Sequence, residues 1–355
     1  MNFPRIRSLF PRALAAAVLL ACVALPLRAR ADAAGDWKAI LAMDAGPEGN
    51  APTRDVAHQL MIAFFDKQEQ ALRAYIAAYP GDAHQVEARL RLSHLLAVRG
   101  ELEAKPKAYE ESVKILDTLA ADRTLPPGKQ ADVAYARITL YMHQVPRPDA
   151  TQRDALMSGI RSFQKQFPAD PRNGVLYAEA ATLYDPDPKV KRELLSEALR
   201  YADDELKQRI NDDFKRLDML GKPLELKFDS VQGTPVDVAD YRGKVVLVYF
   251  FANWSSPSVA GLGEVKRIAE AFSPAEFQVV GVSLDKSRES LTGLLGKYTI
   301  NYPVSFDGKG WEGPVARSLG INSLPTVWLV DRKGNLRILN AIDNTEALIR
   351  QLLRE

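Results

Sequence analysis

The chain has 355 residues, of which 46% are hydrophobic and 26% are charged, and its formal net charge is +2. These proportions are typical of a soluble globular protein with two or three domains. Residues 1–31 hold five arginines and no acid, and without them 42 basic residues face 45 acidic ones. The remaining chain is mildly acidic, which argues against nucleic acid as a partner.

Residues 1–31 have the pattern of an export signal peptide. Three arginines precede an apolar run over residues 13–27, and Ala29-Arg30-Ala31 matches a cleavage site before Asp32. The apolar run is short for a bilayer, so we expect no membrane span. The pattern predicts a periplasmic or otherwise exported protein.

The chain's one cysteine, Cys22, leaves a second possibility open. It follows Leu-Leu-Ala, which resembles a lipoprotein signal, although apolar residues continue past it. A lipid anchor at Cys22 is therefore the alternative to a soluble product. Cleavage after Ala31 would leave a protein without any cysteine, and so without a disulfide or a redox thiol.

Residues 32–220 have an all-α pattern. Apolar residues recur at helical spacing, and proline and glycine interrupt the pattern often enough to predict about eight helices. A sequence echo supports a repeated helical hairpin: an amphipathic segment ending in Tyr79-Pro80-Gly81-Asp82 returns 88 residues later, ending in Phe167-Pro168-Ala169-Asp170. This is similar to tetratricopeptide-type arrays, in which neighbouring hairpins stack. An irregular helical bundle is the alternative.

No metal or cofactor motif is present. The four histidines, His58, His84, His94 and His143, are scattered without metal-ligand spacing, and the sequence has no phosphate-binding loop and no dinucleotide-binding glycine motif. We therefore expect neither a metal nor a cofactor.

The most informative stretch is KVVLVYFFANWSSPS at residues 244–258. A buried strand over Val245–Phe251 leads into Trp254-Ser255-Ser256-Pro257-Ser258, where a new helix is expected to begin. Serine favours the first position of a helix, so Ser255 and Ser258 are expected to start this helix.

Residues 221–355 resemble the TlpA/ResA-type thioredoxin-like family, which is close to the redoxin and AhpC/TSA group. The resemblance rests on an ordered series: an opening hairpin over 221–244, the strand and SSPS, a parallel strand over 276–285, and a closing half over 302–338. The Leu324-Pro325-Thr326 stretch resembles the family's cis-proline loop, so we predict a cis Leu324–Pro325 bond. The resemblance implies an α/β thioredoxin-like domain after the helical region.

Both cysteines of the family's CxxC pair are serine here, at Ser255 and Ser258. The family's chemistry needs a thiolate that attacks a disulfide and a second thiol that resolves the product, so its catalytic residues do not transfer. A serine nucleophile would need an adjacent base, and no histidine follows residue 143. Tyr249 stands where thioredoxins often have a buried acid, and Gly261 stands where the family often has a glutamate.

These observations favour a redox-inactive binding or scaffold protein of the cell envelope, whose partner is a protein or an extended peptide. The expected binding groove consists of Trp254, Ser256, Pro257, Leu324, Pro325 and Thr326. The alternative is a thiol-disulfide oxidoreductase or thiol peroxidase-related protein of the TlpA/redoxin family, so enzyme activity stays open. A hydrolase or transferase that uses other acids is a third hypothesis, which no spacing in the sequence supports.

Overall fold

The computed structural model describes residues 32–49, 53–145 and 147–355, and the proposed signal peptide and Cys22 lie outside these residues. By compactness the chain divides into two units, residues up to Asp122 and residues 123–355. The change from helices to a mixed sheet comes later, after residue 219. The domain boundary expected at residue 220 coincides with the change of fold but not with the division into compact units. It therefore stays a prediction.

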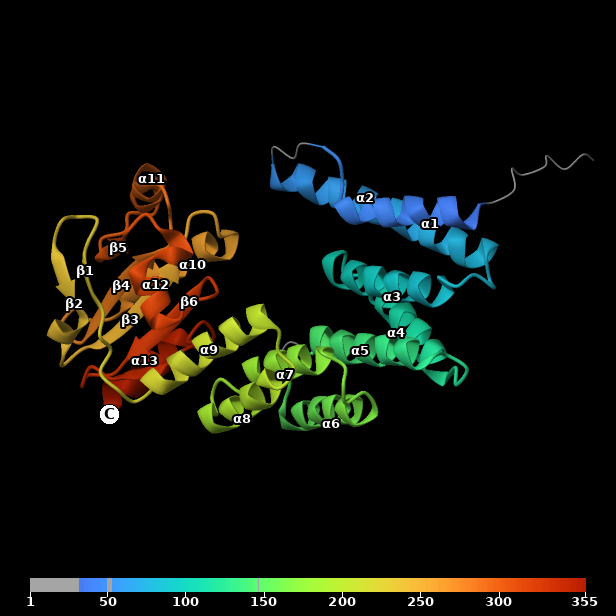
Figure 1. Cartoon of the computed structure of the whole chain (residues 1–355). Coiled ribbons are helices and arrows are strands. Elements are labelled where there is room, and N and C mark those ends of the chain that lie inside the picture. Colours follow the sequence, from blue (N-terminus) through green and yellow to red (C-terminus); the bar gives the residue numbers. More distant parts are fainter. Residues whose placement is uncertain (1–31, 50–52, 146) are drawn as a thin grey trace, which may run out of the picture. The chain divides into compact units, whose positions relative to one another are not determined.

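The first unit is helical (Figure 1). Its elements are α1 (Ala33–Ala42), η1 (Met43–Ala45), α2 (Arg54–Ala78), α3 (Gln85–Leu102) and α4 (Pro106–Ala121). Apolar side chains of α1, α2 and α3 form one core, in which Leu72, Tyr75 and Leu96 are almost fully buried. Gly100 lies inside α3, although glycine is among the residues expected to interrupt helices. A Cβ atom there would come within 3.0 Å of the Tyr109 Cβ atom, so glycine allows α4 to pack closely on α3.

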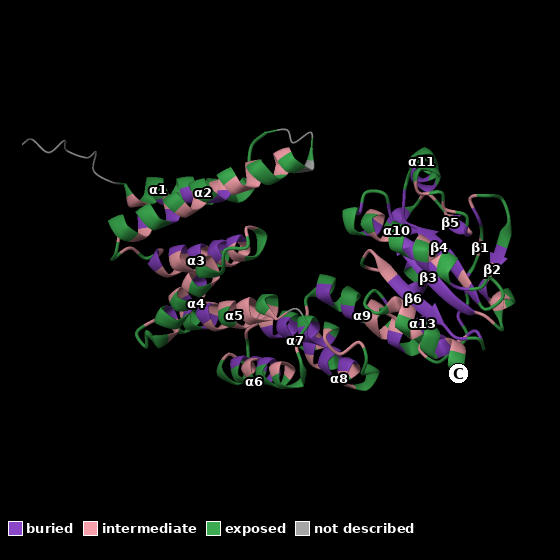
Figure 2. Ribbon diagram, turned by 180° about the vertical axis from the view of Figure 1, so that it is seen from behind, coloured by how far each residue is buried: buried purple, intermediate pink, exposed green. Residues whose placement is uncertain are grey.

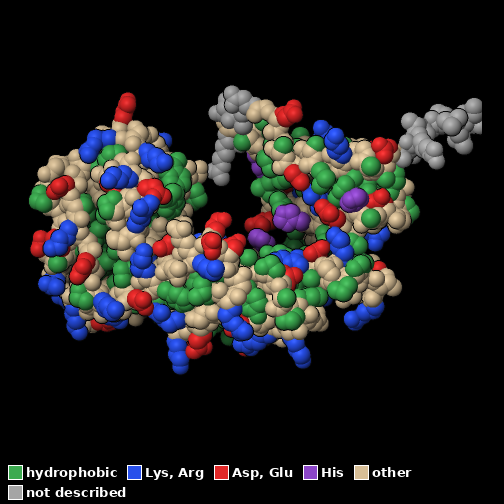
Figure 3. All heavy atoms as spheres, in the orientation of Figure 1, with side chains coloured by type: hydrophobic (Ala, Val, Ile, Leu, Met, Phe, Trp, Pro, Cys, Tyr) green, Lys and Arg blue, Asp and Glu red, His purple; other side chains and the backbone are tan. Residues whose placement is uncertain are grey.

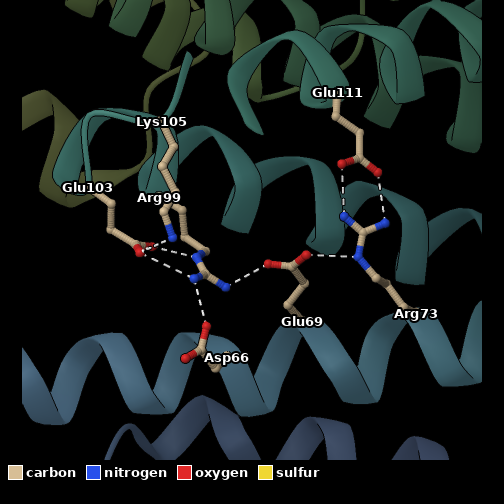
Figure 4. Close-up of polar contacts among 7 residues, drawn as sticks. All are labelled: Asp66, Glu69, Arg73, Arg99, Glu103, Lys105 and Glu111. Atoms are coloured by element: carbon tan, nitrogen blue, oxygen red, sulfur yellow. Dashed lines mark hydrogen bonds and ion pairs between the residues drawn. The ribbon is translucent and has the colours of Figure 1, made fainter. Parts of the chain in front are cut away.

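A charged network joins α2, α3 and α4 (Figure 4). The Arg99 guanidinium, only 8% exposed, contacts Asp66 and Glu69 at 2.6 Å and Glu103 at 2.5 Å. Arg73 contacts Glu69 at 2.8 Å and Glu111 at 2.7 Å. Each arginine therefore connects carboxylates from separate segments, and for the buried Arg99 these partners compensate the loss of water around its charge.

The second unit begins with five more helices. These are α5 (Pro127–Gln144), α6 (Ala150–Gln166), α7 (Arg172–Thr182), α8 (Pro188–Leu199) and α9 (Asp204–Met219). The described residues before 220 thus hold nine α-helices rather than about eight. The break between α8 and α9 contains neither proline nor glycine. It is set by the Asp203 carboxylate, which caps α9 by accepting from the Leu206 N–H at 2.8 Å.

The sequence echo corresponds to a repeated backbone corner. Tyr79 ends α2 with φ −126° and ψ 58°, and Phe167 ends α6 with φ −128° and ψ 64°. A buried amide holds each corner: Gln85 Nε2 donates to the Tyr79 carbonyl at 2.6 Å, and Asn173 Nδ2 donates to the Phe167 carbonyl at 2.9 Å. The prediction of a repeated helical hairpin is confirmed at these two corners.

Residues 221–355 form the expected α/β domain. Its strands are β1 (Lys227–Asp229), β2 (Pro235–Asp237), β3 (Val245–Phe251), β4 (Phe277–Ser283), β5 (Val304–Phe306), β6 (Thr326–Val330) and β7 (Leu336–Ile338). Its helices are η2 (Val238–Tyr241), α10 (Ser256–Ala271), α11 (Arg288–Tyr298), η3 (Gly310–Glu312), α12 (Pro314–Leu319) and α13 (Thr345–Arg354). Strands β1 and β2 form the opening hairpin, and the other five form a sheet in the order β5-β4-β3-β6-β7.

Strand β3 is the centre of this sheet and is buried along its whole length (Figure 2). It runs parallel to β4 and antiparallel to β6. Its side chains alternate between the two faces of the sheet: Leu247 and Tyr249 join a core with α10 and α13, and Val248 and Phe250 join a core with α12. A strand buried on both faces explains why its sequence is a continuous apolar run.

Helix α9 is attached to the α/β domain. Lys215 Nζ donates to the Arg317 carbonyl at 2.9 Å, and the Arg216 guanidinium donates to the Gly320 carbonyl. Gly320 has a φ of +65°, and a Cβ atom there would come within 2.9 Å of the Asp212 carbonyl oxygen. Glycine is therefore required at this contact, both for the backbone conformation and for the close approach of α9.

Candidate functional site

The start of α10 carries the serine pair. Ser255 is the helix N-cap, with its side-chain oxygen accepting from the Ser258 N–H at 3.4 Å. Ser255 is 8% exposed and Ser258 is fully buried, while Ser256 and Pro257 are exposed on the first turn. The helix start that the sequence predicts is therefore present, with only part of the SSPS segment open to a ligand.

The two serine side chains are hydrogen-bonded to each other. The Ser258 hydroxyl donates to the Ser255 Oγ at 2.9 Å. Within the described residues, neither hydroxyl bonds to a histidine, a lysine or a carboxylate. A serine nucleophile needs such a base to remove its proton, so this geometry provides no activated hydroxyl.

Tyr249 lies beneath this helix turn. Its hydroxyl donates to the Ser258 carbonyl at 2.6 Å, and its side chain is fully buried. Burial raises the pKa of the Tyr249 phenol above its ordinary value, so the group stays neutral and acts as a hydrogen-bond donor. At the position where thioredoxins often have a buried acid, this chain therefore has a neutral phenol that donates to the helix backbone.

Gly261 belongs to the same arrangement. A Cβ atom at position 261 would lie 2.6 Å from the Tyr249 hydroxyl, closer than real Cβ contacts come. The glycine in α10 therefore leaves room for the phenol. Sequence comparison with the family identifies positions 249 and 261 as two separate departures, but only the structure shows that they touch.

The proline loop has the predicted geometry. The Leu324–Pro325 peptide bond is cis, which confirms the sequence prediction. Leu324, Pro325 and Thr326 are half-buried, and the Thr326 hydroxyl donates to the Ser323 carbonyl at 2.8 Å. Thr326 pairs with Phe250 near the end of β3 that leads to α10, so the sheet register brings the loop toward the serine pair.

Trp254, the first residue of the expected groove, is 56% exposed. Its indole N–H donates to the Leu284 carbonyl at 3.4 Å, and its ring lies 5.8 Å from the ring of Trp311, centroid to centroid. Trp311 was not among the residues that the sequence singled out. No motif marks it, because it comes from η3, more than fifty positions away along the chain.

A buried carboxylate fixes the loop before Trp254. Asp285 is 3% exposed and accepts from the Asn253 backbone N–H at 2.9 Å and from the Ser283 hydroxyl at 2.8 Å. Asn253 also donates from its side chain to the Ser290 hydroxyl at 2.9 Å. Asp285 thus acts as a hydrogen-bond acceptor for the loop that carries Trp254, a positioning role that its sequence context does not reveal.

In the described ranges, no group of three or more histidine, cysteine, aspartate or glutamate side chains is arranged to hold a metal ion. None of the helices in these ranges has the length and apolar character needed to cross a bilayer.

Comparison with known proteins finds relatives of the C-terminal part of the chain. Residues 221–338 match the model of the AhpC/TSA family. Two curated relatives are the thioredoxin-like protein YneN of Bacillus subtilis and the thiol-disulfide oxidoreductase ResA of Geobacillus thermodenitrificans. The first is 23% identical over 132 residues, 36% of this chain and 75% of that protein. The second is 20% identical over 123 residues, 35% of this chain and 69% of that protein.

The C-terminal part of this chain is a TlpA/ResA-type thioredoxin-like domain. Solved structures similar to this redoxin domain include a thiol-disulfide oxidoreductase from Bacteroides fragilis, with 23% identity and a TM-score of 0.34, covering 37% of this chain and 98% of that one. Another is a secreted thiol-disulfide isomerase from Corynebacterium glutamicum, with 21% identity and a TM-score of 0.33, covering 38% and 86% of the two chains.

Proposed function

We propose that this protein is a redox-inactive, thioredoxin-like binding protein of the cell envelope. The observation that carries the proposal is the hydrogen bond between the Ser258 and Ser255 hydroxyls, at the place where the family has its two thiols. Two hydroxyls cannot exchange disulfides, because the reaction requires a thiolate nucleophile and a second thiol.

The surroundings of the serine pair support the same conclusion. Tyr249 is a neutral donor to the helix backbone, and Gly261 leaves space for it. These features hold the first turn of α10 in place without any sulfur. The serine pair therefore lies in a closely packed, hydrogen-bonded turn.

The proposed ligand is an extended segment of a protein. Trp254 and the first turn of α10 on one side, and the cis-proline loop on the other, offer exposed apolar surface and backbone groups, which extended peptides use when they bind. The helical residues 32–220, proposed as a domain of their own, provide further surface for a partner protein.

The test combines a redox assay with a binding assay. The purified protein should not reduce insulin disulfides or consume peroxide with a thiol donor above a blank without protein. It should bind a reduced and carboxymethylated unfolded protein, a probe that has no disulfide to exchange. Disulfide or peroxide turnover that Ser255→Ala abolishes would contradict the proposal.

The second candidate is a thiol-disulfide oxidoreductase, which the names of the relatives favour. The chain's only cysteine is Cys22, so this activity would need a thiol from another molecule. Mixing the protein with a low-molecular-weight thiol decides the matter. If the protein is an oxidoreductase, it should reduce insulin disulfides faster with the thiol than the thiol does alone. If it is only a binding protein, it should not raise the rate of disulfide reduction.

The proposed location is the periplasm or another exported compartment, because residues 1–31 have the pattern of a signal peptide. Mass spectrometry of the exported protein should find Asp32 at the N-terminus. A diacylated Cys22 would instead establish the lipoprotein alternative.

A further inference from the structure

A groove of about 640 Å³ lies between α9 and the thioredoxin-like domain, within the second compact unit. Helix α9 contributes Lys207, Gln208, Asn211 and Lys215 to its lining, and the thioredoxin-like domain contributes Trp311 and Asn322. The bonds from α9 to the Arg317 and Gly320 carbonyls fix the two walls relative to each other. The groove is therefore part of the folded unit and is formed only when both segments are present.

An exposed aromatic pair joins the groove to the SSPS segment. Trp311, 38% exposed, lines the groove, and its ring contacts that of Trp254 at the start of the SSPS segment. Exposed tryptophans bury large apolar areas with little loss of side-chain entropy, so they are common anchors of protein interfaces. This pair continues the surface that we propose for peptide binding into the groove beside α9.

The charges of the groove neutralise one another. Lys207 lies 3.3 Å from Asp204, and Lys215 lies 3.5 Å from Asp212. Arg317 pairs with Glu312 on the wall that the thioredoxin-like domain contributes. Over the face shown in Figure 3, basic and acidic side chains are likewise interspersed rather than separated. A neutral groove favours neither a polyanion nor a polycation and fits an uncharged ligand.

Three amide side chains point to the chemistry of that ligand. Gln208, Asn211 and Asn322 all line the groove, and none of them has a side-chain hydrogen bond to another described residue. An amide offers one acceptor and two donors, the same groups that a peptide backbone offers in return. An extended main chain could therefore bond to both walls.

We propose that this groove binds an extended, uncharged segment of a partner protein, with an apolar side chain of that segment on Trp254 and Trp311. The inference rests on the proposed binding function and adds a source of ligand specificity. Helix α9, from the helical region, forms one wall of the binding site. Partner choice then depends on α9 as well as on residues of the thioredoxin-like domain.

The experiment uses short overlapping peptides of reduced, carboxymethylated α-lactalbumin, presented as an array to the full-length protein. Binding should favour peptides with aromatic or aliphatic residues and no net charge, and it should change little between low and high salt. Affinity for the best peptide should fall about tenfold in Trp311→Ala, as for an interface anchor. It should fall severalfold in the double variant Gln208→Ala/Asn211→Ala.

Two matched controls should bind like the unaltered protein. Gln351→Ala removes an exposed amide from α13 of the same unit, and Leu102→Ala removes an exposed apolar side chain from the first unit. If peptides bind with the same affinity in the Trp311 and α9 variants, the groove inference is wrong and the proposed function stands. If no peptide binds the protein at all, both the groove inference and the proposed binding function are wrong. A steep loss of affinity as the salt concentration rises would contradict the inference that the ligand is uncharged.

Discussion

The hydroxyl of Tyr249 occupies the space into which any side chain at position 261 would project. It lies 2.6 Å from the place of a Cβ atom on Gly261 and donates to the Ser258 carbonyl, also at 2.6 Å. The phenol and the glycine therefore depend on each other, and both border the turn that carries the two serines. The departure from a redox site thus involves four positions that fit together, not two isolated substitutions.

This dependence gives a prediction for a double-mutant cycle. Gly261→Ala should destabilise the protein by about 1–3 kcal/mol, because the added methyl overpacks against the Tyr249 hydroxyl. In the Tyr249→Phe background the same change should be neutral or stabilising, by up to about 1 kcal/mol, since alanine is the better helix former. Urea unfolding of the four proteins gives the coupling free energy.

Gly263 provides the matched control, because it lies on the same helix and a Cβ atom there would meet nothing within 4 Å. Gly263→Ala should be neutral or stabilising in both backgrounds. Equal effects of Gly261→Ala with and without the Tyr249 hydroxyl would show that the close approach does not limit position 261.

A second prediction concerns the lost thiols. In Ser255→Cys/Ser258→Cys, the two side chains should be close enough for an intramolecular disulfide, since their hydroxyl oxygens are 2.9 Å apart. The start of α10 should lower the pKa of the new thiol at position 255 below its ordinary value of about 8.5. Thiol titration and an insulin-reduction assay should show the disulfide and weak activity, limited because Tyr249 cannot accept a proton.

The control for this variant is Ser256→Cys/Ser258→Cys. Residues two apart on a helix do not face each other, so this pair should not close a disulfide under the same mild oxidant. If the 255/258 pair also stays reduced and its thiols titrate normally, the groove has lost the family's shape. The peptide-binding proposal would then lose its main support.

Much of this arrangement could be predicted from the sequence, because β3 and the SSPS helix start are local signals and the resemblance to the family implies the cis bond before Pro325. The contact between Tyr249 and Gly261 could not, since it depends on how α10 lies on the sheet. Trp311 and the α9 wall were missed for the same reason: residues far apart in the chain meet only in three dimensions. The break before α9 contains no proline or glycine, because a single capping side chain, Asp203, sets it.

The repeated corner shows the opposite case, because the sequence echo predicts that the same turn follows two different helices. Gln85 and Asn173 are buried, and each donates from one amide nitrogen to two backbone carbonyls. We expect Gln85→Ala and Asn173→Ala each to cost about 1–3 kcal/mol, because each removes two side-chain hydrogen bonds that hold the corner. Gln70→Ala, which removes an exposed amide from α2, is the control and should be nearly neutral.

Hydrogen exchange can locate these two effects. Because the corners belong to different compact units, Gln85→Ala should raise exchange in α2 and α3, and Asn173→Ala in α6 and α7. A loss of protection that spreads equally over both units in either variant would show that the corners do not stabilise their own hairpins separately.

The last prediction concerns acid and the network of Figure 4. Hydrogen bonds from Arg99, and then from Lys105, lower the pKa of Glu103 from its ordinary 4.5 to about 2. The folded state therefore binds the Glu103 proton more weakly than the unfolded chain does. The stabilisation from this carboxylate is complete above pH 4.5 and is lost as the pH falls toward 2.

Glu103→Gln should accordingly be less stable than the unaltered protein near neutral pH, and the difference should vanish near pH 2. Urea unfolding at a series of pH values, followed by hydrogen exchange of α2, α3 and α4, measures this difference. Glu101→Gln is the matched control, because it removes an exposed carboxylate from α3 that is not part of the network in Figure 4. A Glu103→Gln difference that stays constant down to pH 2 would show that Glu103 does not stabilise this unit through its charge.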